Sequence, residues 1–240
     1  MTSKIGLWQQ IKEDFAQPLK NDPAINSKVE LFFNYPGVWA IVNYRFANRL
    51  YNRGLKRVAR ALMGLTQFIT NIDIHPAATI GRRVFLDHAF GVVIGETTII
   101  EDDILIYQGV TLGGVNLNRG QKRHPTIKSG SVIGAGAKVL GDITIGRNCR
   151  VGSNSVVVNS VEENSTAVGI PARVIKKGRD KSPLSHNKIP DINKELFIYL
   201  FKRVKALETA VNSQHHDENL VEKDMELEAI YKQFLKSVKE

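Results

Sequence analysis

A histidine and several carboxylates interrupt an otherwise repetitive sequence, and their residue types suit proton transfer. His88 follows Asp87 in the stretch LDHAFGVVIGE. An imidazole with a pKa near neutrality can take a proton from a hydroxyl group and return it, and a carboxylate on its other ring nitrogen fixes the tautomer. Asp73 lies fifteen residues before His88. Because a triangular coil of three six-residue units takes about eighteen residues, the two side chains are predicted to meet across one corner of adjacent coils. The alternative is a surface histidine at a corner.

Two further groups of charged residues suit a ligand that carries both a negative and a positive charge. Arg123 and His124, at the end of VNLNRGQKRHP, offer hydrogen-bond donors for a carboxylate. Asp22 and Asp87 can receive an ammonium group. Together these residues predict an amino acid as ligand. Simpler interpretations stay open: a solvated basic loop, and an N-cap role for Asp22, which precedes Pro23 where a helix could begin.

The elements that must position these residues are predicted by a repeat of six. Aliphatic residues recur at this step, with two extra residues before the second block and nine before the third. A step of six fits neither a helix nor one long strand, whereas small or turn-prone residues within each unit indicate a short strand followed by a corner. This pattern predicts a parallel β-helix of hexapeptide repeats, in which neighbouring coils stack around an aliphatic core. The repeat positions are Ile74, Ile80, Leu86; Ile94, Ile100, Ile106, Leu112; and Ile127, Ile133, Val139, Ile145, Val151, Val157.

The repeat divides the chain into three predicted parts. Residues 1–70 have helical spacing and form an N-terminal α-helical region, residues 71–176 form the β-helix and catalytic domain, and residues 177–240 form a linker and a helical tail. In the tail, apolar residues from Leu196 to Leu207 predict one amphipathic helix, and those from Leu227 to Val238 predict a second.

Composition excludes several classes of protein. Hydrophobic residues make up 42% of 240 residues, and no stretch approaches the roughly 18 apolar residues of a membrane span. The single cysteine excludes an intramolecular disulfide, and the six histidines show no zinc-site spacing, so no metal is expected. The net charge of +9 is spread along the chain without interleaved aromatic residues, so neither nucleic acid nor membrane is an expected partner. We expect a soluble cytoplasmic protein. His75, which precedes Pro76, is expected to be structural.

Five segments closely resemble bacterial and plant serine O-acetyltransferases. They are DIHPAATIGRRVFLDHAFGVVIGE, YQGVTLGG, KRHPTI, VIGAGAKVLGDITIG and VGIPARVI. The resemblance covers about residues 20 to 176, and the combination of LDHAFG with KRHP is more specific than the hexapeptide ladder, which many acyltransferases share. It implies a left-handed β-helix, assembled as a homotrimer with active sites between subunits.

The resemblance also implies an activity and a role for each matching residue. The activity is transfer of the acetyl group of acetyl-CoA to the hydroxyl of L-serine in cysteine biosynthesis, with acetyl-CoA as co-substrate and no permanently bound cofactor. By this resemblance, His88 is the general base and Asp73 is its orienting partner. The implied contacts are Asp22 and Asp87 with the serine amino group, Arg123 and His124 with its carboxylate, and Gly114, Ala135, Gly136 and Ser153 with the CoA arm.

Two departures from the family pattern bear on assembly. The N-terminal helical region is short compared with the long members, whose trimers pair into hexamers, so the choice between trimer and hexamer stays open. Long members also end in a tail whose terminal isoleucine docks into cysteine synthase. This sequence ends KSVKE after an extended tail, so that partnership stays open too, and a role of the tail in oligomerisation is the alternative.

Two other functions compete with serine acetylation. One is a hexapeptide acyltransferase that acts on another amino acid or on a sugar; the pairing of Asp22 with Arg123 favours an amino acid. The other is a β-helical scaffold without catalytic activity, which would not need a histidine flanked by carboxylates.

Overall fold

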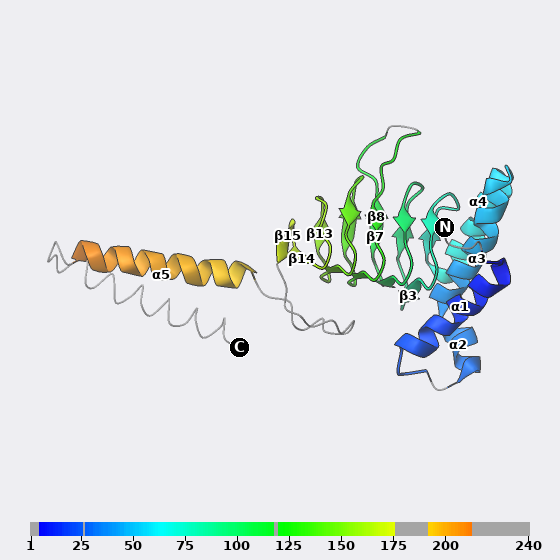
Figure 1. Cartoon of the computed structure of the whole chain (residues 1–240), viewed down its shortest axis with the longest axis horizontal. Coiled ribbons are helices and arrows are strands. Elements are labelled where there is room, and N and C mark those ends of the chain that lie inside the picture. Colours follow the sequence, from blue (N-terminus) through cyan, green and yellow to red (C-terminus); the bar gives the residue numbers. More distant parts are fainter. Residues whose placement is uncertain (1–4, 26, 118–119, 176–191, 213–240) are drawn as a thin grey trace. The chain divides into compact units, whose positions relative to one another are not determined.

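The computed structural model describes residues 5–25, 27–117, 120–175 and 192–212. It divides into two compact units, Met1–Asn187 and Lys188–Glu240. In the described residues, the first unit combines four helices with a stack of short strands, and the second contributes one helix (Figure 1). The helices are α1 (Leu7–Asn21), α2 (Lys28–Asn34), α3 (Pro36–Asn52), α4 (Lys56–Thr70) and α5 (Ile192–Asn212). The predicted linker and second tail helix lie outside the described residues.

The strands form three parallel sheets that wind around one core, as the period of six predicts. The first sheet has the order β1-β4-β7-β10-β13, the second β2-β5-β8-β11, and the third β3-β6-β9-β12-β14-β15, in which only the last pair is antiparallel. The strands are β1 (Asp73–Ile74), β2 (Thr79–Ile80), β3 (Phe85–Asp87), β4 (Val93–Ile94), β5 (Ile99–Ile100), β6 (Leu105–Tyr107), β7 (Thr111–Gly113), β8 (Thr126–Ile127), β9 (Val132–Ile133), β10 (Lys138–Leu140), β11 (Thr144–Ile145), β12 (Arg150–Val151), β13 (Val156–Val157), β14 (Thr166–Gly169) and β15 (Ala172–Ile175).

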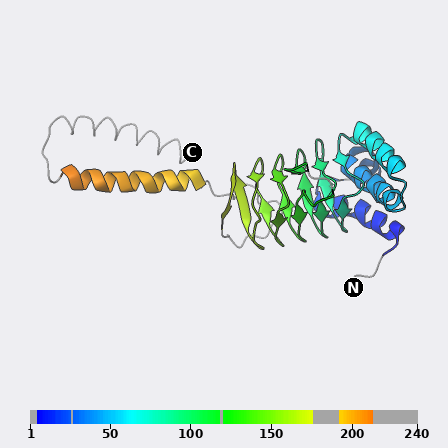
Figure 2. The same ribbon diagram turned by 90° about the horizontal axis from the view of Figure 1, so that it is seen from above.

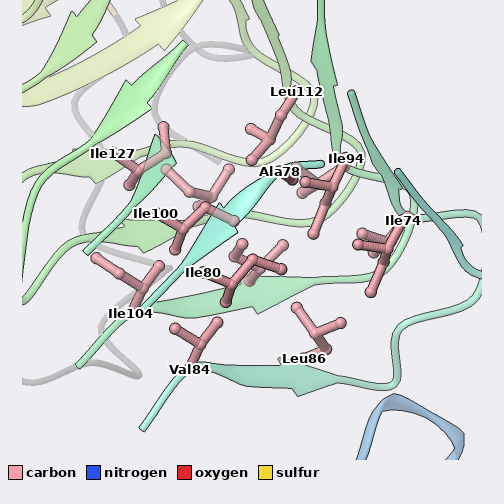
Figure 3. Packing of buried hydrophobic residues seen from close by; sticks show 14 of the residues in the cluster. Ile74, Ala78, Ile80, Val84, Leu86, Ile94, Ile100, Ile104, Leu112 and Ile127 are labelled. Atoms are coloured by element: carbon pink, nitrogen blue, oxygen red, sulfur yellow. The ribbon is translucent and has the colours of Figure 1, made fainter. Parts of the chain in front are cut away.

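All thirteen predicted repeat positions are buried, none more than 7% exposed. The register stacks equivalent positions on one another: Ile74 lies opposite Ile94, which lies opposite Leu112 in the next coil. Figure 3 shows these side chains directed into the interior of the coils. Both predicted phase slips are confirmed, because they fall in the corner between β3 and β4 and in the segment between β7 and β8. The predicted left-handed β-helix class, with helices before it and in the tail, is therefore confirmed.

Helices α1–α4 gather at the end of the solenoid where the first coil begins (Figures 1 and 2). The strands of a first coil have no coil beneath them, so their backbone groups need other partners. Helix α3 supplies these partners. The Tyr44 hydroxyl donates to the Ala78 carbonyl and accepts the Ile80 N–H at 3.1 Å, and Asn48 donates to the Pro76 carbonyl at 2.8 Å.

A buried ion pair fastens α1 and α3 to the same coil. The Arg45 guanidinium donates to both carboxylate oxygens of Asp14, at 3.0 and 3.1 Å, and to the carbonyls of Ile80 and Gly81 at 2.7 Å each. Both side chains are almost fully buried. Losing either partner would leave a buried charge uncompensated, which typically costs about 3–5 kcal/mol. The pair therefore fixes the position of α1, whose C-terminal end leads into Asp22.

The packing of α3 on β3 depends on a glycine, and this contact yields a test of the fold. A Cβ at Gly37 would lie 2.2 Å from the Leu86 carbonyl oxygen, whereas a Cβ at Gly64, within α4, would meet nothing within 4 Å. We predict that Gly37→Ala lowers the free energy of unfolding by about 1–3 kcal/mol because the backbones must separate. The control Gly64→Ala should raise it by up to about 1 kcal/mol through helix propensity. Urea unfolding of both variants measures this, and equal effects would contradict the close packing.

Candidate active site: two half-sites on separate edges of the solenoid

The first half-site lies at the corner between β3 and β4. His88 and Ala89 have φ values of 57° and 55°, and two successive non-glycine residues in this region cost about 1–2 kcal/mol each. Backbone hydrogen bonds hold the turn, from Phe90 N–H to the His88 carbonyl and from Gly91 N–H to the Asn71 carbonyl, each at 2.8 Å. The extra residues thus form a fixed, strained corner on which the His88 side chain is exposed.

Asp22 reaches this corner from the C-terminal end of α1. Its carboxylate accepts the Ala24 N–H at 2.8 Å and the Tyr35 hydroxyl at 2.6 Å. The Tyr35 hydrogen bond is the main reason that the pKa of Asp22 lies below its ordinary value, and the charge of His88 acts in the same direction. The alternative role of Asp22 as an N-cap is wrong: Asp22 follows α1, and Ser27 caps the next helix by accepting the Glu30 N–H at 3.1 Å.

Asp87 carries a buried oxygen without a partner. Its Oδ1 atom and Thr98 Oγ1 are the buried side-chain oxygens without a hydrogen bond in the part of the chain that the structure describes. Burial raises the pKa of Asp87; the charge of His88 opposes this shift, whereas the charge of Asp22 reinforces it. A desolvated carboxylate beside a second carboxylate is an environment that a cationic ligand would stabilise. Tyr107, opposite Asp87 in the next coil, lines the same corner.

The pairing of Asp73 with His88 stays a prediction. Asp73 begins β1 and lies opposite Val93, just beyond the His88 corner. Between these two described residues there is no hydrogen bond or ion pair. His75, expected to be structural, accepts the Ala77 N–H on Nδ1 at 3.1 Å and contacts the Tyr51 ring edge-on at 5.8 Å between centroids.

The second half-site lies on the edge between the first and second sheets. The segment from β7 to β8 projects from this edge (Figure 1) and returns through Arg123 and His124. Arg123 forms an ion pair with Glu96 at 3.1 Å. Lys122 donates to the His124 carbonyl and pairs with Asp142 at 3.2 Å. These contacts tie the returning segment to the coils on either side of it.

Residues expected to line the CoA arm are divided between the two edges. Ala135, Gly136 and Ser153 lie at the corners after β9 and β12, on the edge that carries His88. These corners are stacked, since Asn154 N–H donates to the Ala135 carbonyl at 2.8 Å. Gly114 lies on the other edge, at the start of the projecting segment. The whole first sheet separates the edges, so one chain does not bring His88 together with Arg123.

Comparison with known proteins agrees with this architecture. The family model described as "Bacterial transferase hexapeptide (six repeats)" matches residues 124–159. A serine acetyltransferase of Synechococcus elongatus is 45% identical over 203 residues, which are 84% of this chain and 83% of that protein. The chain belongs to the serine acetyltransferase family.

Two solved serine acetyltransferases are similar in structure as well. That of Neisseria gonorrhoeae in complex with serine is 38% identical, with a TM-score of 0.67, over 70% of this chain and 69% of that one. A serine acetyltransferase in complex with CoA is 41% identical, with a TM-score of 0.66, over 70% of both chains. The predicted family is confirmed.

Sequence reasoning missed three residues that hold the two half-sites of this serine acetyltransferase family member. Tyr35 binds Asp22, Glu96 binds Arg123, and Thr97 contacts both Arg123 and His124. The six-residue register could have indicated two of them, because it places Glu96 and Thr97 at the corner after β4, next to the segment that projects between β7 and β8. Among the described residues, no group of three His, Cys, Asp or Glu side chains could hold a metal ion, and no helix is long and apolar enough to cross a membrane.

The half-buried His75 and the buried His124 yield a pH prediction. Burial lowers the pKa of His75 and of His124 below the ordinary value of 6.5. In the unfolded chain both bind protons more readily, so their contribution to stability is fully present well above pH 6.5 and is lost as the pH falls from there through the lowered pKa values. We expect the free energy of unfolding to decrease between pH about 7.5 and about 5.5. Urea unfolding should show a smaller decrease in His75→Gln and in His124→Gln, and an undiminished decrease in both variants would contradict this.

Proposed function

We propose that this chain catalyses acetyl transfer from acetyl-CoA to the hydroxyl of L-serine, giving O-acetylserine and CoA in cysteine biosynthesis. The observation that carries the proposal is the unpartnered, buried Oδ1 of Asp87 beside the exposed His88. A buried carboxylate oxygen that lacks a partner suits the ammonium group of an amino acid, and the adjacent imidazole suits its hydroxyl. The relatives named serine acetyltransferase, including structures with serine and with CoA, support this choice of substrates.

In the proposed mechanism, His88 accepts the proton of the serine hydroxyl as the oxygen attacks the thioester carbonyl. The tetrahedral intermediate carries an oxyanion, which backbone N–H groups can stabilise. When it collapses, the C–S bond breaks, and the CoA sulfur takes the proton from the imidazolium. Asp22 and Asp87 hold the ammonium group meanwhile, and Asp73 orients His88. No covalent enzyme intermediate is needed, and Cys149 is buried in the core.

The proposal includes a homotrimer. His88 and Asp87 lie on one edge of the chain and Arg123 and His124 on another, so a serine molecule held at both ends requires the edges of two copies. The same holds for the CoA arm, whose expected residues are divided in the same way. A closed ring of three copies would pair unlike edges at each interface. We therefore propose active sites between subunits.

Other parts of the proposal rest on the resemblance. Residues 1–70, 71–176 and 177–240 would serve as helical region, catalytic β-helix and helical tail, in a protein of the cytoplasm. If trimers pair into hexamers, the exposed apolar side chains of α1 and α2 are the candidate contact surface. Among them, Trp8 is 72% exposed and Phe33 is 75% exposed. Association with cysteine synthase is carried by the resemblance alone.

A thiol-release assay tests the reaction. With acetyl-CoA and a panel of acceptors, we expect turnover on L-serine, and we expect His88→Ala to lower kcat by at least about 10²-fold because a positioned base contributes that much. A matched control is Phe90→Ala, which alters an exposed side chain of the same corner. Strong turnover on a sugar or another amino acid, but not on serine, would favour the alternative acceptor. Unchanged serine turnover in His88→Ala would overturn the proposed base.

A further inference from the structure

His124 is held through one of its two ring nitrogens. Nδ1 accepts the backbone N–H of Thr97 at 3.2 Å and lies 2.9 Å from the Thr97 hydroxyl oxygen. A backbone N–H can only donate a hydrogen bond, so Nδ1 must be the nitrogen without a proton. In this arrangement a neutral ring therefore carries its proton on Nε2.

The hydroxyl of Thr97 is fully used at the same contact. Its oxygen accepts the backbone N–H of Arg123 at 3.0 Å and that of His124 at 3.1 Å. Both of its acceptor positions are then occupied, and its own proton is directed to Nδ1 of the ring. One hydroxyl thus fixes the returning backbone and the imidazole together. We name this set of four contacts between Thr97 and residues 123–124 the Thr97 clasp.

The surroundings keep the ring neutral and in place. The ring is buried, 7% of the residue being exposed. Burial lowers the pKa of His124, and the charges of Arg123 and Lys122 act in the same direction, against Glu96. The ring also lies directly over Gly95, where a Cβ would come within 2.0 Å of Nε2. Within the described residues, Nε2 has no hydrogen-bond partner, so it is the donor that remains for a ligand.

We propose that Thr97 is a positioning residue, which fixes His124 as the Nε2–H tautomer so that the ring offers one donor to the carboxylate of the amino-acid substrate. This deepens the proposed function and rests on it for the identity of the ligand. It separates the two members of the second half-site. Arg123 brings charge, and His124 brings a neutral donor whose direction is set before the substrate arrives. Pre-set donors reduce the cost of ordering on binding.

Two substitutions of Thr97 separate the effect of its hydroxyl from that of its backbone. Thr97→Val removes the hydroxyl at nearly unchanged side-chain shape and leaves the backbone N–H, whereas Thr97→Ser retains the hydroxyl. The matched control is Thr98→Val, because Thr98 lies in the same corner, is 1% exposed, and has a hydroxyl oxygen without a partner. We expect Thr97→Val to raise the KM for serine by about tenfold, the equivalent of one hydrogen bond, with a smaller change in kcat and in the KM for acetyl-CoA. Thr97→Ser and Thr98→Val should stay within about twofold of the unsubstituted protein.

A direct readout of the tautomer separates positioning from mere loop closure. In ¹⁵N NMR of histidine-labelled protein, with the His124 signals assigned by their loss in His124→Gln, we expect an unprotonated Nδ1 and a protonated Nε2. Because the hydroxyl contacts hold the ring against the backbone N–H of residue 97, Thr97→Val should loosen that contact and admit the Nδ1–H tautomer as a second form, and Thr97→Ser should restore the single form. A protonated Nδ1 in the unsubstituted protein would overturn the proposal, even if Thr97→Val fails to fold. A Thr97→Val protein with an unchanged tautomer and an unchanged KM would also overturn it. If the tautomer is as expected but serine is not a substrate, the proposed function is wrong, whereas the positioning role of the Thr97 clasp is retained.

Discussion

The structure depends on the hydrogen bonding of each coil to the coil on either side of it. Because strands of two to four residues must pair in register with strands one coil away, the chain keeps a step of six between core positions within each block of the repeat from Ile74 to Val157. Each step places one aliphatic side chain inside. Any residue beyond this step therefore lies in a segment that projects from an edge between two sheets, where it does not disturb the hydrogen bonds between strands. The two segments with such additional residues, between β3 and β4 and between β7 and β8, carry His88 and the pair Arg123–His124.

The helical region has a mechanical role as well as a chemical one. Tyr44, Arg45 and Asn48 satisfy the unpaired backbone groups of the first coil, and the Arg45–Asp14 pair fixes α1 against it. Asp22 directly follows α1 and Tyr35 directly precedes α3, and their side chains meet beside the strained His88 corner. The helices that cover the open end of the solenoid thus also bring the residues of the first half-site together.

The period of six made the core, the coils and both segments with additional residues predictable from sequence, because core positions in a solenoid depend only on the step. The lateral contacts were not predictable in the same way. Asp22 suggested an N-cap before Pro23, but the chain continues through a turn and Ser27 caps the helix, so the carboxylate is available for Tyr35. Thr97 occupies an ordinary corner of the repeat, and its importance comes from a segment 26 residues away. Such contacts follow from stacking between coils, which the step alone does not reveal.

The first sheet keeps the two half-sites apart in one chain, and we propose that each active site is therefore built from two copies. Co-expression of a His88→Ala chain with an Arg123→Ala chain, followed by purification of mixed oligomers, tests it most directly. If the chains assort at random in a ring, about one quarter of the sites combine an intact His88 with an intact Arg123. Thiol release with serine and acetyl-CoA should then recover to about one quarter of the unsubstituted rate, far above either variant alone. Activity of the mixed oligomers no higher than that of the separate variants would contradict the account.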